Sequence, residues 1–561
     1  MKNIIFSSIA SLAIFCLASC SQSEVTVPES VNIIPQPSQI EVLDGAFSVA
    51  GTSVSCSPAF DELSQKAVSD FAQKLSLTTG KKSRFSVKDA AGKGISFSLD
   101  SALPEEGYTI EVGQNSVEVT AAGLNGVVYA IQSLSQMLPA EFFGEVAAKD
   151  ANWALRCCTI VDAPRFGYRG VLLDCCRHFF DVDQVKKFID LLALHKMNIF
   201  HWHLSEDQGW RIEIKKYPKL TEIGSVRHGT MIGKDWSSND GIEYGGFYTQ
   251  EEAKDIVSYA ASKGITIIPE IDLPGHMMSA LASYPELGCT GGPYEVNTKW
   301  GVMDQVLCPG KETTFEFLEG VLEEIIEIFP SEYIHIGGDE CPKTQWAVCP
   351  DCQARIKELG LVSDEIASAE TRLQNYVTAR VQKFLNDRGR KIIGWTEILD
   401  GELAPGATVM SWLGEQGAIK ASTNGFDVIM TPSGSGCYLD YYQTDKLDIE
   451  PLAIGGNSSL EKLYSYEPYE GVPEDAQHHI LGVQGNMWTE FIAKENHLQY
   501  MALPRFCALS EVQWCSPEQK DIERLKGDIA HISKIYDAMG CAWCKAIFGE
   551  YGLPGVPGGT N

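Results

Sequence analysis

From residue 162 onward the chain repeats one unit, an apolar strand followed by a loop and an amphipathic helix. The predicted strands cover eight segments: 168–173, 198–204, 266–271, 333–337, 391–395, 408–412, 427–431 and 480–484. The clearest helical patterns between them are 182–195, 250–263, 315–329 and 371–388. Eight strands alternating with helices over about 350 residues predict a (β/α)8 TIM barrel, whose reacting groups come from the carboxyl ends of the strands. A doubly wound open sheet is the alternative, and the lack of a glycine-rich phosphate loop after any strand weighs against it.

The chain before the barrel mixes strands and helices in another way. Residues 108–112 and 117–120 alternate like a two-stranded ribbon, and 123–138 has apolar residues at helical spacing. We therefore predict a small α+β domain with its helices on one side of a sheet. The expected division is a non-catalytic α+β domain at 21–160, the catalytic barrel at 161–545 and a flexible tail at 546–561.

The first residues have the pattern of an export signal. An apolar run at 4–17 follows Lys2 and is too short for a membrane span. The sequence Leu17-Ala18-Ser19-Cys20 then resembles the bacterial lipoprotein box, in which the cysteine is lipidated. We expect a lipoprotein signal peptide at 1–20 and a protein anchored to the bacterial envelope, at the outer membrane, on its periplasmic or cell-surface side. An ordinary secretion signal is the alternative.

The chain is strongly acidic, with a formal net charge of −29. This charge repels phosphate backbones and anionic lipid, so we expect no nucleic-acid partner and membrane contact only through the lipid at Cys20. A neutral, sugar-like ligand fits better. The sequence leaves the oligomeric state open, with a homodimer as one alternative.

The chain has 17 cysteines, a high number for an exported protein. Cys349-x-x-Cys352 and Cys541-x-x-Cys544 contain enough thiols for a four-thiolate zinc site, but the two pairs lie far outside zinc-ribbon spacing. We therefore expect local disulfides or buried thiols, and no metal.

The strand at 333–337 leads through two glycines to two adjacent acids, Asp339 and Glu340. Gly337 and Gly338 permit the backbone turn that would bring both carboxylates to one place. Such a pair is costly to desolvate and occurs where one acid holds a proton and the other stays charged. A helix N-terminus that the two acids merely cap is the alternative.

The other strand ends supply more acids, together with aromatic and basic groups. They include Arg177, Glu206, Asp207, His276, Trp395, Trp412, Tyr438, Asp440, Trp488 and Glu490. Indoles offer flat apolar faces to the C–H faces of a sugar, while carboxylates and arginine bind its hydroxyls. Each tryptophan alone could be a core residue, but three at strand ends on one rim predict a sugar pocket.

The segment His335-Ile336-Gly337-Gly338-Asp339-Glu340 resembles the signature of glycoside hydrolase family 20, the β-N-acetylhexosaminidases. The other segments that carry the resemblance are 162–170, 177–179, 198–204, 269–276 and 438–440. The likeness extends from about Val31 to about Tyr536, and the first domain is similar to the non-catalytic α+β domain that precedes the barrel in this family.

The resemblance implies an exo-acting, retaining hydrolase of terminal N-acetylglucosamine or N-acetylgalactosamine that needs no cofactor. In such substrate-assisted catalysis the 2-acetamido oxygen attacks the anomeric carbon, and water opens the resulting oxazolinium ion. By the same resemblance Glu340 is the general acid and then the base, and Asp339 holds the acetamide N–H and stabilises the positive charge. Tyr438 donates to the acetamide oxygen. Asp339 is expected to stay ionised and to raise the pKa of Glu340.

Binding roles are implied for the remaining strand ends. The walls around the acetamide and the ring would be Trp395, Trp412 and Trp488. The hydroxyl-binding groups would be Arg177, Asp440 and Glu490. A relay from Glu340 through His276 to an acid is also implied. Many relatives have two aspartates where this chain has Glu206-Asp207, so which acid serves stays open.

Two other classes of protein remain as alternatives. One is a metal-dependent barrel amidohydrolase, because His201-x-His203 with His276 downstream mimics a histidine metal site. The other is a sugar-binding lipoprotein without catalysis, against which the intact acid pair argues. Within the hydrolase class, release of lacto-N-biose instead of one sugar is open, as are the sugar configuration, the linkage and the aglycone.

Overall fold

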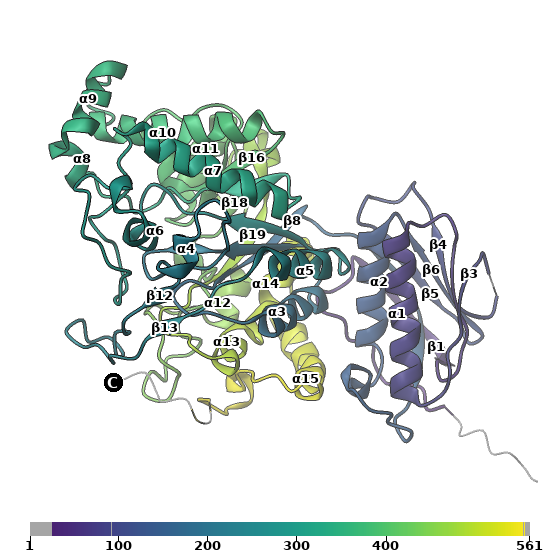
Figure 1. The fold of residues 1–561 in the computed structure, drawn as a ribbon. Coiled ribbons are helices and arrows are strands. Elements are labelled where there is room, and N and C mark those ends of the chain that lie inside the picture. The colour runs from purple at the N-terminus through teal and green to yellow at the C-terminus, as the bar shows by residue number, and fades with distance from the viewer. Residues whose placement is uncertain (1–24, 91, 554, 556–561) are drawn as a thin grey trace, which may run out of the picture.

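The computed structural model describes residues 25–90, 92–553 and 555, and they form two domains side by side (Figure 1). Cys20 and the predicted signal at 1–20 lie outside the described residues. The described part of the predicted tail contains one short 3-10 turn, η7 (Ala546–Phe548).

The N-terminal domain is a seven-stranded sheet with two helices on one face (Figure 1). The strand order is β1 (Gln39–Ser48), β7 (Ala154–Asp162), β5 (Tyr108–Val112), β6 (Ser116–Ala121), β4 (Gly94–Leu99), β2 (Val54–Cys56) and β3 (Phe85–Val87). The helices are α1 (Glu62–Thr79) and α2 (Leu124–Gln136). The predicted ribbon is the antiparallel β5–β6 pair, with Tyr108 opposite Ala121. The α+β prediction is confirmed.

The second domain is a closed barrel of eight parallel strands, as predicted. The strands are β8 (Tyr168–Asp174), β9 (Ile199–His203), β14 (Thr266–Glu270), β15 (Tyr333–His335), β16 (Lys391–Trp395), β17 (Thr408–Ser411), β18 (Asp427–Met430) and β19 (Ile480–Met487). Pairing of β19 with β8, from Gly482↔Tyr168 to Met487↔Leu173, closes the ring. Two short hairpins lie in the loops: β10 (Ser205–Glu206) with β11 (Gly209–Trp210), and β12 (Val226–Arg227) with β13 (Tyr244–Gly245).

Helices surround the barrel where amphipathic patterns predict them. The longer ones are α3 (Val182–Leu194), α5 (Gln250–Ala261), α7 (Glu312–Ile328), α10 (Ala369–Asn386), α14 (Arg505–Trp514) and α15 (Ile522–Ala538). The shorter ones are α4 (Lys219–Glu222), α6 (Met278–Ser283), α8 (Thr344–Val348), α9 (Pro350–Leu359), α11 (Glu415–Thr423), α12 (Leu460–Ser465) and α13 (Glu495–Ala502). At the start of α5, Thr249 and Glu252 form a capping box, in which each side chain accepts from the other's backbone N–H.

The two domains meet at a buried ion pair. Lys196 Nζ lies 3.0 Å from Asp162 Oδ2, and both side chains are fully buried. The Asp162 carboxylate also accepts from the Tyr108 hydroxyl and, at 2.8 Å, from the Trp514 indole. Because Lys196 lies three residues before the start of β9, the N-terminal domain is fixed near the amino ends of the barrel strands. The carboxyl ends, where a barrel carries its chemistry, lie away from it.

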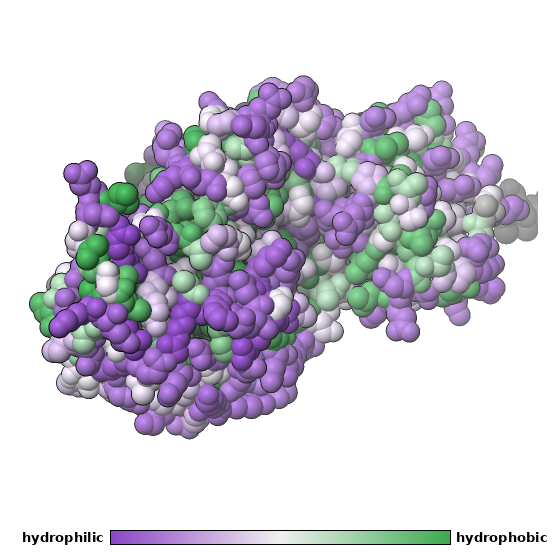
Figure 2. All heavy atoms as spheres, turned by 90° about the horizontal axis from the view of Figure 1, so that it is seen from above, coloured by the Kyte–Doolittle hydropathy of each residue, from purple (hydrophilic) through white to green (hydrophobic). Residues whose placement is uncertain are grey.

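Hydrophilic residues dominate the face of the molecule seen in Figure 2, with hydrophobic ones in small groups between them. Within the described residues, no helix combines the length and the apolar character needed to cross a membrane.

Candidate active site

A strained turn follows β15. Gly337 and Gly338 have φ angles of 65° and 103°, as the two glycines predict. A Cβ on Gly337 would lie 1.7 Å from Asp272 Oδ1, so a side chain has no room there. Glu340 itself has a φ of 44°, a conformation that L-residues adopt at a cost when their surroundings hold them in it. The acids do not cap a helix, because the N-cap residue of α8 is Lys343.

The turn brings both acids to a cavity of about 390 Å³ at the carboxyl ends of the barrel strands. Every residue predicted for catalysis or substrate binding lines this one cavity: Arg177, Asp339, Glu340, Trp395, Trp412, Tyr438, Asp440, Trp488 and Glu490. Groups from six strand ends, up to 313 residues apart (490 − 177), therefore share one space.

His276 connects the acid pair to two further acids. Its Nε2 lies 3.5 Å from Glu340 Oε2 and 3.8 Å from Asp339 Oδ2. Its Nδ1 lies 2.7 Å from Glu206 Oε1 and 3.3 Å from Asp207 Oδ2. Glu206 and Asp207, which stand where many relatives have two aspartates, thus both reach the imidazole of His276. The longer side chain, Glu206, is the nearer one. Like Glu340, His276 has a positive φ, 51°.

The charges in this chain of contacts alternate. Burial tends to lower the pKa of His276, but the Glu206 carboxylate and the surrounding hydrogen bonds raise it well above its usual range. Burial tends to raise the pKa of Glu206, but Arg177 and His276 hold it well below its usual range. Burial raises the pKa of Asp207. Glu206 is therefore the charged partner of His276, and Asp207 mainly positions the loop by accepting from the Met278 N–H at 2.9 Å.

Asp339 differs from its prediction. Burial, reinforced by the charges of Glu397, Glu270 and Glu340 and opposed by His276, raises its pKa to about 7. From the sequence, Asp339 is expected to stay ionised and the pKa of Glu340 to rise. In the protein alone Asp339 is half protonated near neutral pH, because the depth of a side chain in the barrel mouth is a tertiary property that adjacency in sequence does not reveal.

The indoles are held in place by carboxylates. Trp395 Nε1 donates to Glu270 Oε1 at 2.8 Å, and Trp412 Nε1 donates to Glu397 Oε2 at 3.0 Å. The Tyr438 ring stacks on Trp412, with centroids 6.1 Å apart and planes 18° apart. These contacts fix flat aromatic faces on one side of the cavity, as recognition of a sugar ring requires.

Several buried oxygens in the cavity have no hydrogen-bond partner within the described part of the chain. They are Asp339 Oδ1, both carboxylate oxygens of Asp440, and Glu490 Oε2. Burial raises the pKa of Asp440, and the charge of Glu490 adds to that effect. Burial also raises the pKa of Glu490, opposed by Arg177 and reinforced by Asp174 and Glu206. Because buried acceptors without donors are unfavourable, such oxygens are suited to the hydroxyl and N–H groups of a ligand.

Arg177 is fixed by the protein instead. Its guanidinium lies 3.0 Å from Glu206 Oε2 and 3.4 Å from Asp174 Oδ2, and it packs 5.1 Å from the centre of the Trp488 ring. It donates to Gln208 as well, through Nε at 3.1 Å. The group predicted to bind hydroxyls is thus already oriented by two acids.

The cavity extends beyond the predicted residues. Its other lining groups include Lys234, Trp236, Trp300, Tyr441 and Phe491. Most of them lie on the long loops before β13 and after α6, not at strand ends, so the strand-end argument missed them. Trp236 and Trp300 lie within polar loop segments, and this is the sequence feature that could have identified them as lining residues. Trp236 is 55% exposed at the rim of the cavity.

The histidines of the amidohydrolase alternative do not converge on one ligand position. His201 Nε2 and His203 Nδ1 lie 3.0 and 2.5 Å from Glu270 Oε2, beneath the cavity. His276 instead faces Glu206 and the acid pair. The imidazoles bind carboxylates in a chain, so these residues do not form the histidine metal site that this hypothesis requires.

A barrel whose mouth holds an acid pair beside indole walls and carboxylates without partners among the described residues is typical of a glycosidase. Comparison with family models agrees: the catalytic domain of glycosyl hydrolase family 20 matches residues 166–517, and domain 2 of the same family matches residues 30–163. The chain belongs to glycosyl hydrolase family 20.

Individual relatives agree with this assignment. The chain is 42% identical over 538 residues to a beta-hexosaminidase of Porphyromonas gingivalis, covering 93% of this chain and 66% of that protein, slightly less than two thirds of its length. It is 36% identical to a beta-hexosaminidase of Vibrio furnissii, covering 87% of this chain and 77% of the relative.

Solved structures show the same architecture. The GH20 beta-N-acetylhexosaminidase of Streptomyces coelicolor A3(2) aligns with a TM-score of 0.80 and 29% identity, over 95% of this chain and all of that one. A GH20 exo beta-N-acetylglucosaminidase of Vibrio harveyi, in complex with N-acetylglucosamine, aligns with a TM-score of 0.78 and 33% identity, over 92% of this chain and 80% of that one.

Proposed function

We propose that this chain is an exo-acting, retaining β-N-acetylhexosaminidase that removes terminal non-reducing N-acetyl-D-hexosamine from glycans. One observation carries the proposal: Asp339 and Glu340, both in contact with His276, open into the same cavity as three indoles and Asp440, whose carboxylate oxygens have no partner among the described residues. The beta-hexosaminidase names of the relatives and the N-acetylglucosamine bound in the Vibrio harveyi structure support the substrate class.

In the proposed reaction the sugar supplies its own nucleophile. The 2-acetamido oxygen forms a bond to the anomeric carbon while the bond to the leaving oxygen breaks, and Glu340 gives that oxygen its proton. Glu340 then takes a proton from the water that opens the oxazolinium ion. Tyr438 donates to the acetamide oxygen, and His276, held by Glu206, keeps the Glu340 carboxyl in position.

Asp339 acts on the other end of the acetamide. As a carboxylate it accepts the acetamide N–H and stabilises the positive charge that develops on the oxazoline ring. Both interactions favour the ionised acid, so bound substrate lowers the Asp339 pKa from its value of about 7 in the protein alone. The acid is thus charged at the moment when its charge is needed.

A chromogenic N-acetyl-β-D-glucosaminide tests the activity. Glu340→Gln is expected to lower kcat by about 10²–10⁴-fold, the usual contribution of a general acid and base, with an unchanged melting temperature. The matched control Glu402→Gln alters an exposed glutamate, 91% exposed at its side chain, and should leave turnover unchanged. Full activity in Glu340→Gln would reject the assignment.

Two further measurements address the finer points. Strong inhibition by a thiazoline analogue of the oxazoline supports attack by the substrate, and no inhibition would favour an enzymic nucleophile. Defined oligosaccharides with product identification separate release of one sugar from release of a disaccharide.

We also propose a lipid anchor at Cys20. Cys20→Ala should then move the protein from the membrane fraction to the soluble fraction, and unchanged fractionation would count against the anchor.

A further inference from the structure

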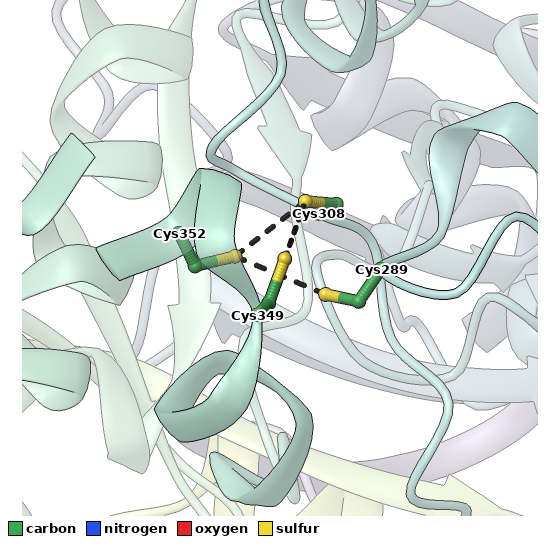
Figure 3. Close-up of side chains that lie close together, drawn as sticks. All are labelled: Cys289, Cys308, Cys349 and Cys352. Atoms are coloured by element: carbon green, nitrogen blue, oxygen red, sulfur yellow. Dashed lines mark hydrogen bonds between the residues drawn. The ribbon is translucent and has the colours of Figure 1, made fainter. Parts of the chain in front are cut away.

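Four cysteine side chains converge beside the active-site loops (Figure 3). Cys289 and Cys308 lie in the long connection between β14 and α7, and Cys349 and Cys352 lie at the start of α9, in the connection after β15. Figure 3 shows the four sulfur atoms directed toward one another, and all lie within 4.8 Å of each other.

The sulfur separations have the size of the edges of a metal tetrahedron. Cys308 Sγ lies 3.5 Å from Cys352 Sγ and 3.7 Å from Cys349 Sγ, and Cys289 Sγ lies 3.8 Å from Cys352 Sγ. A tetrahedral Zn²⁺ with Zn–S bonds of about 2.3 Å places its sulfurs about 3.8 Å apart. A disulfide places them at about 2.05 Å.

The cluster is closed to solvent on most sides. Cys308 and Cys352 are fully buried and Cys349 is 4% exposed, while Cys289 is partly exposed. Four thiolates complete a tetrahedron and leave no position for water or substrate, which is typical of structural zinc and not of catalytic zinc.

The surrounding backbone suits thiolates. The Gly310 N–H bonds to the Cys308 sulfur, and Cys352 lies in the first turn of α9, where the helix dipole stabilises negative charge. Gly310 also lets the two connections touch, because a Cβ there would lie 2.2 Å from the carbonyl carbon of Asp351.

We propose that Cys289, Cys308, Cys349 and Cys352 bind one Zn²⁺ as four thiolates. Each thiol gives its proton to solvent on binding. The ion joins the connection after β14, which carries His276, to the connection after β15, which begins with the acid pair. The ion is therefore structural, and it holds the connection that carries His276 in a fixed position relative to Asp339 and Glu340.

The sequence prediction of no metal is revised by this proposal. In the sequence, the second pair of this kind is Cys541-x-x-Cys544, and its distance from Cys349-x-x-Cys352 is far outside zinc-ribbon spacing. In the structure the partners of the first pair are two cysteines from the preceding connection, 41 to 63 positions earlier. Two barrel loops that are distant in sequence meet in space, and no spacing motif records that.

Metal analysis of the purified full chain tests the proposal. We expect about one zinc per chain by inductively coupled plasma mass spectrometry after dialysis, as for a closed four-thiolate site. Cys352→Ser should lose most of that zinc. The matched control Cys56→Ala removes a fully buried thiol of the N-terminal domain and should keep it. The wild-type measurement stands by itself if Cys352→Ser fails to fold.

Two other outcomes would overturn the proposal. Disulfides among the four cysteines, found by peptide mapping under non-reducing conditions, exclude a four-thiolate site, whereas zinc predicts that all four alkylate once the protein is denatured with a chelator. Stoichiometric iron with a visible absorption band would exclude zinc as the ion.

If the site holds zinc, a strong chelator should lower the melting temperature of the wild type and of Cys541→Ser equally, because Cys541 lies outside the cluster.

Discussion

Two buried acids, one beneath the cavity and one in its wall, differ in the number of partners that their carboxylate oxygens have within the protein. Glu270 lies beneath the cavity and its carboxylate contacts His201, His203, His335 and the Trp395 indole. Asp440 lies in the cavity wall, and both of its oxygens lack a partner among the described residues. Both acids are inaccessible and both come from strand ends. The difference is that both oxygens of Glu270 have partners within the protein, whereas neither oxygen of Asp440 has one among the described residues.

The largest expected effect comes from Glu270. Glu270→Gln removes the charge that three imidazoles and an indole share, and a broken buried ion-pair network costs about 3–5 kcal/mol. We therefore expect the free energy of unfolding, measured with urea, to fall by that amount. The exposed control Glu332→Gln, in a surface pair with Lys391, should stay within about 0.5 kcal/mol of wild type. A Glu270→Gln variant as stable as wild type would remove the distinction between the two acids.

The next effect depends on pH and comes from Asp339. Its folded pKa of about 7 is higher than the value of about 3.9 in an unfolded chain, so the folded protein binds this proton more tightly. That contribution to stability is complete below about pH 4 and is lost as the pH rises through about 7. Asp339→Asn cannot lose it.

The measurement is the unfolding free energy of both proteins at two pH values. At pH 8 Asp339→Asn should be more stable than wild type by on the order of 1–4 kcal/mol, at about 1.4 kcal/mol per pKa unit, and the gap should close near pH 4. Turnover of the variant should be strongly reduced at both. A stability gap that is independent of pH would contradict the burial argument. The Glu270 pKa is lowered by its three histidines, so its contribution has the opposite sign and is lost as the pH falls.

The smallest expected effect on stability comes from Asp440. Asp440→Asn removes a buried acid that has no hydrogen-bond partner within the described part of the chain, so the unfolding free energy at pH 8 should stay the same or rise by about 1 kcal/mol. The Michaelis constant should increase, because a hydroxyl acceptor is lost. Asp174→Asn is the matched comparison: Asp174 accepts from the backbone N–H groups of Cys176 and Thr489 and should lose stability. Equal losses in the two variants would mean that unpartnered oxygens do not identify the binding acids.

The sequence contained most of the fold, for a physical reason. The eight barrel strands are rich in apolar residues because both faces of a parallel sheet are buried, and this made them recognisable in the sequence. The deviations are local. β15 ends at His335, two residues earlier than predicted, because the left-handed Gly337 cannot continue a strand. β19 runs three residues further than predicted, to Met487, because its polar residues face the barrel interior.

The candidate site was less predictable than the fold. Strand ends located the acid pair and the indoles, because the barrel brings all carboxyl ends to one rim. Properties set by tertiary packing did not follow from the strand ends: the raised pKa of Asp339, the rim contribution of Trp236, and the meeting of Cys289 with Cys352. Each depends on long loops whose course the local pattern does not specify.

The attachment of the small domain at the amino ends of the barrel strands affects how far the barrel opening would lie from a membrane. Residues near the described start are fixed to that domain, since Asn152 donates to Thr26 O and Arg156 to Pro28 O. If the proposed lipid is attached at Cys20, six positions before Thr26, a fully extended connection would allow roughly 20 Å of height above a bilayer. The small domain would then lie between the membrane and the barrel, with the barrel opening directed away from the membrane. Such an orientation favours glycans arriving from the surrounding fluid over those displayed on the same membrane.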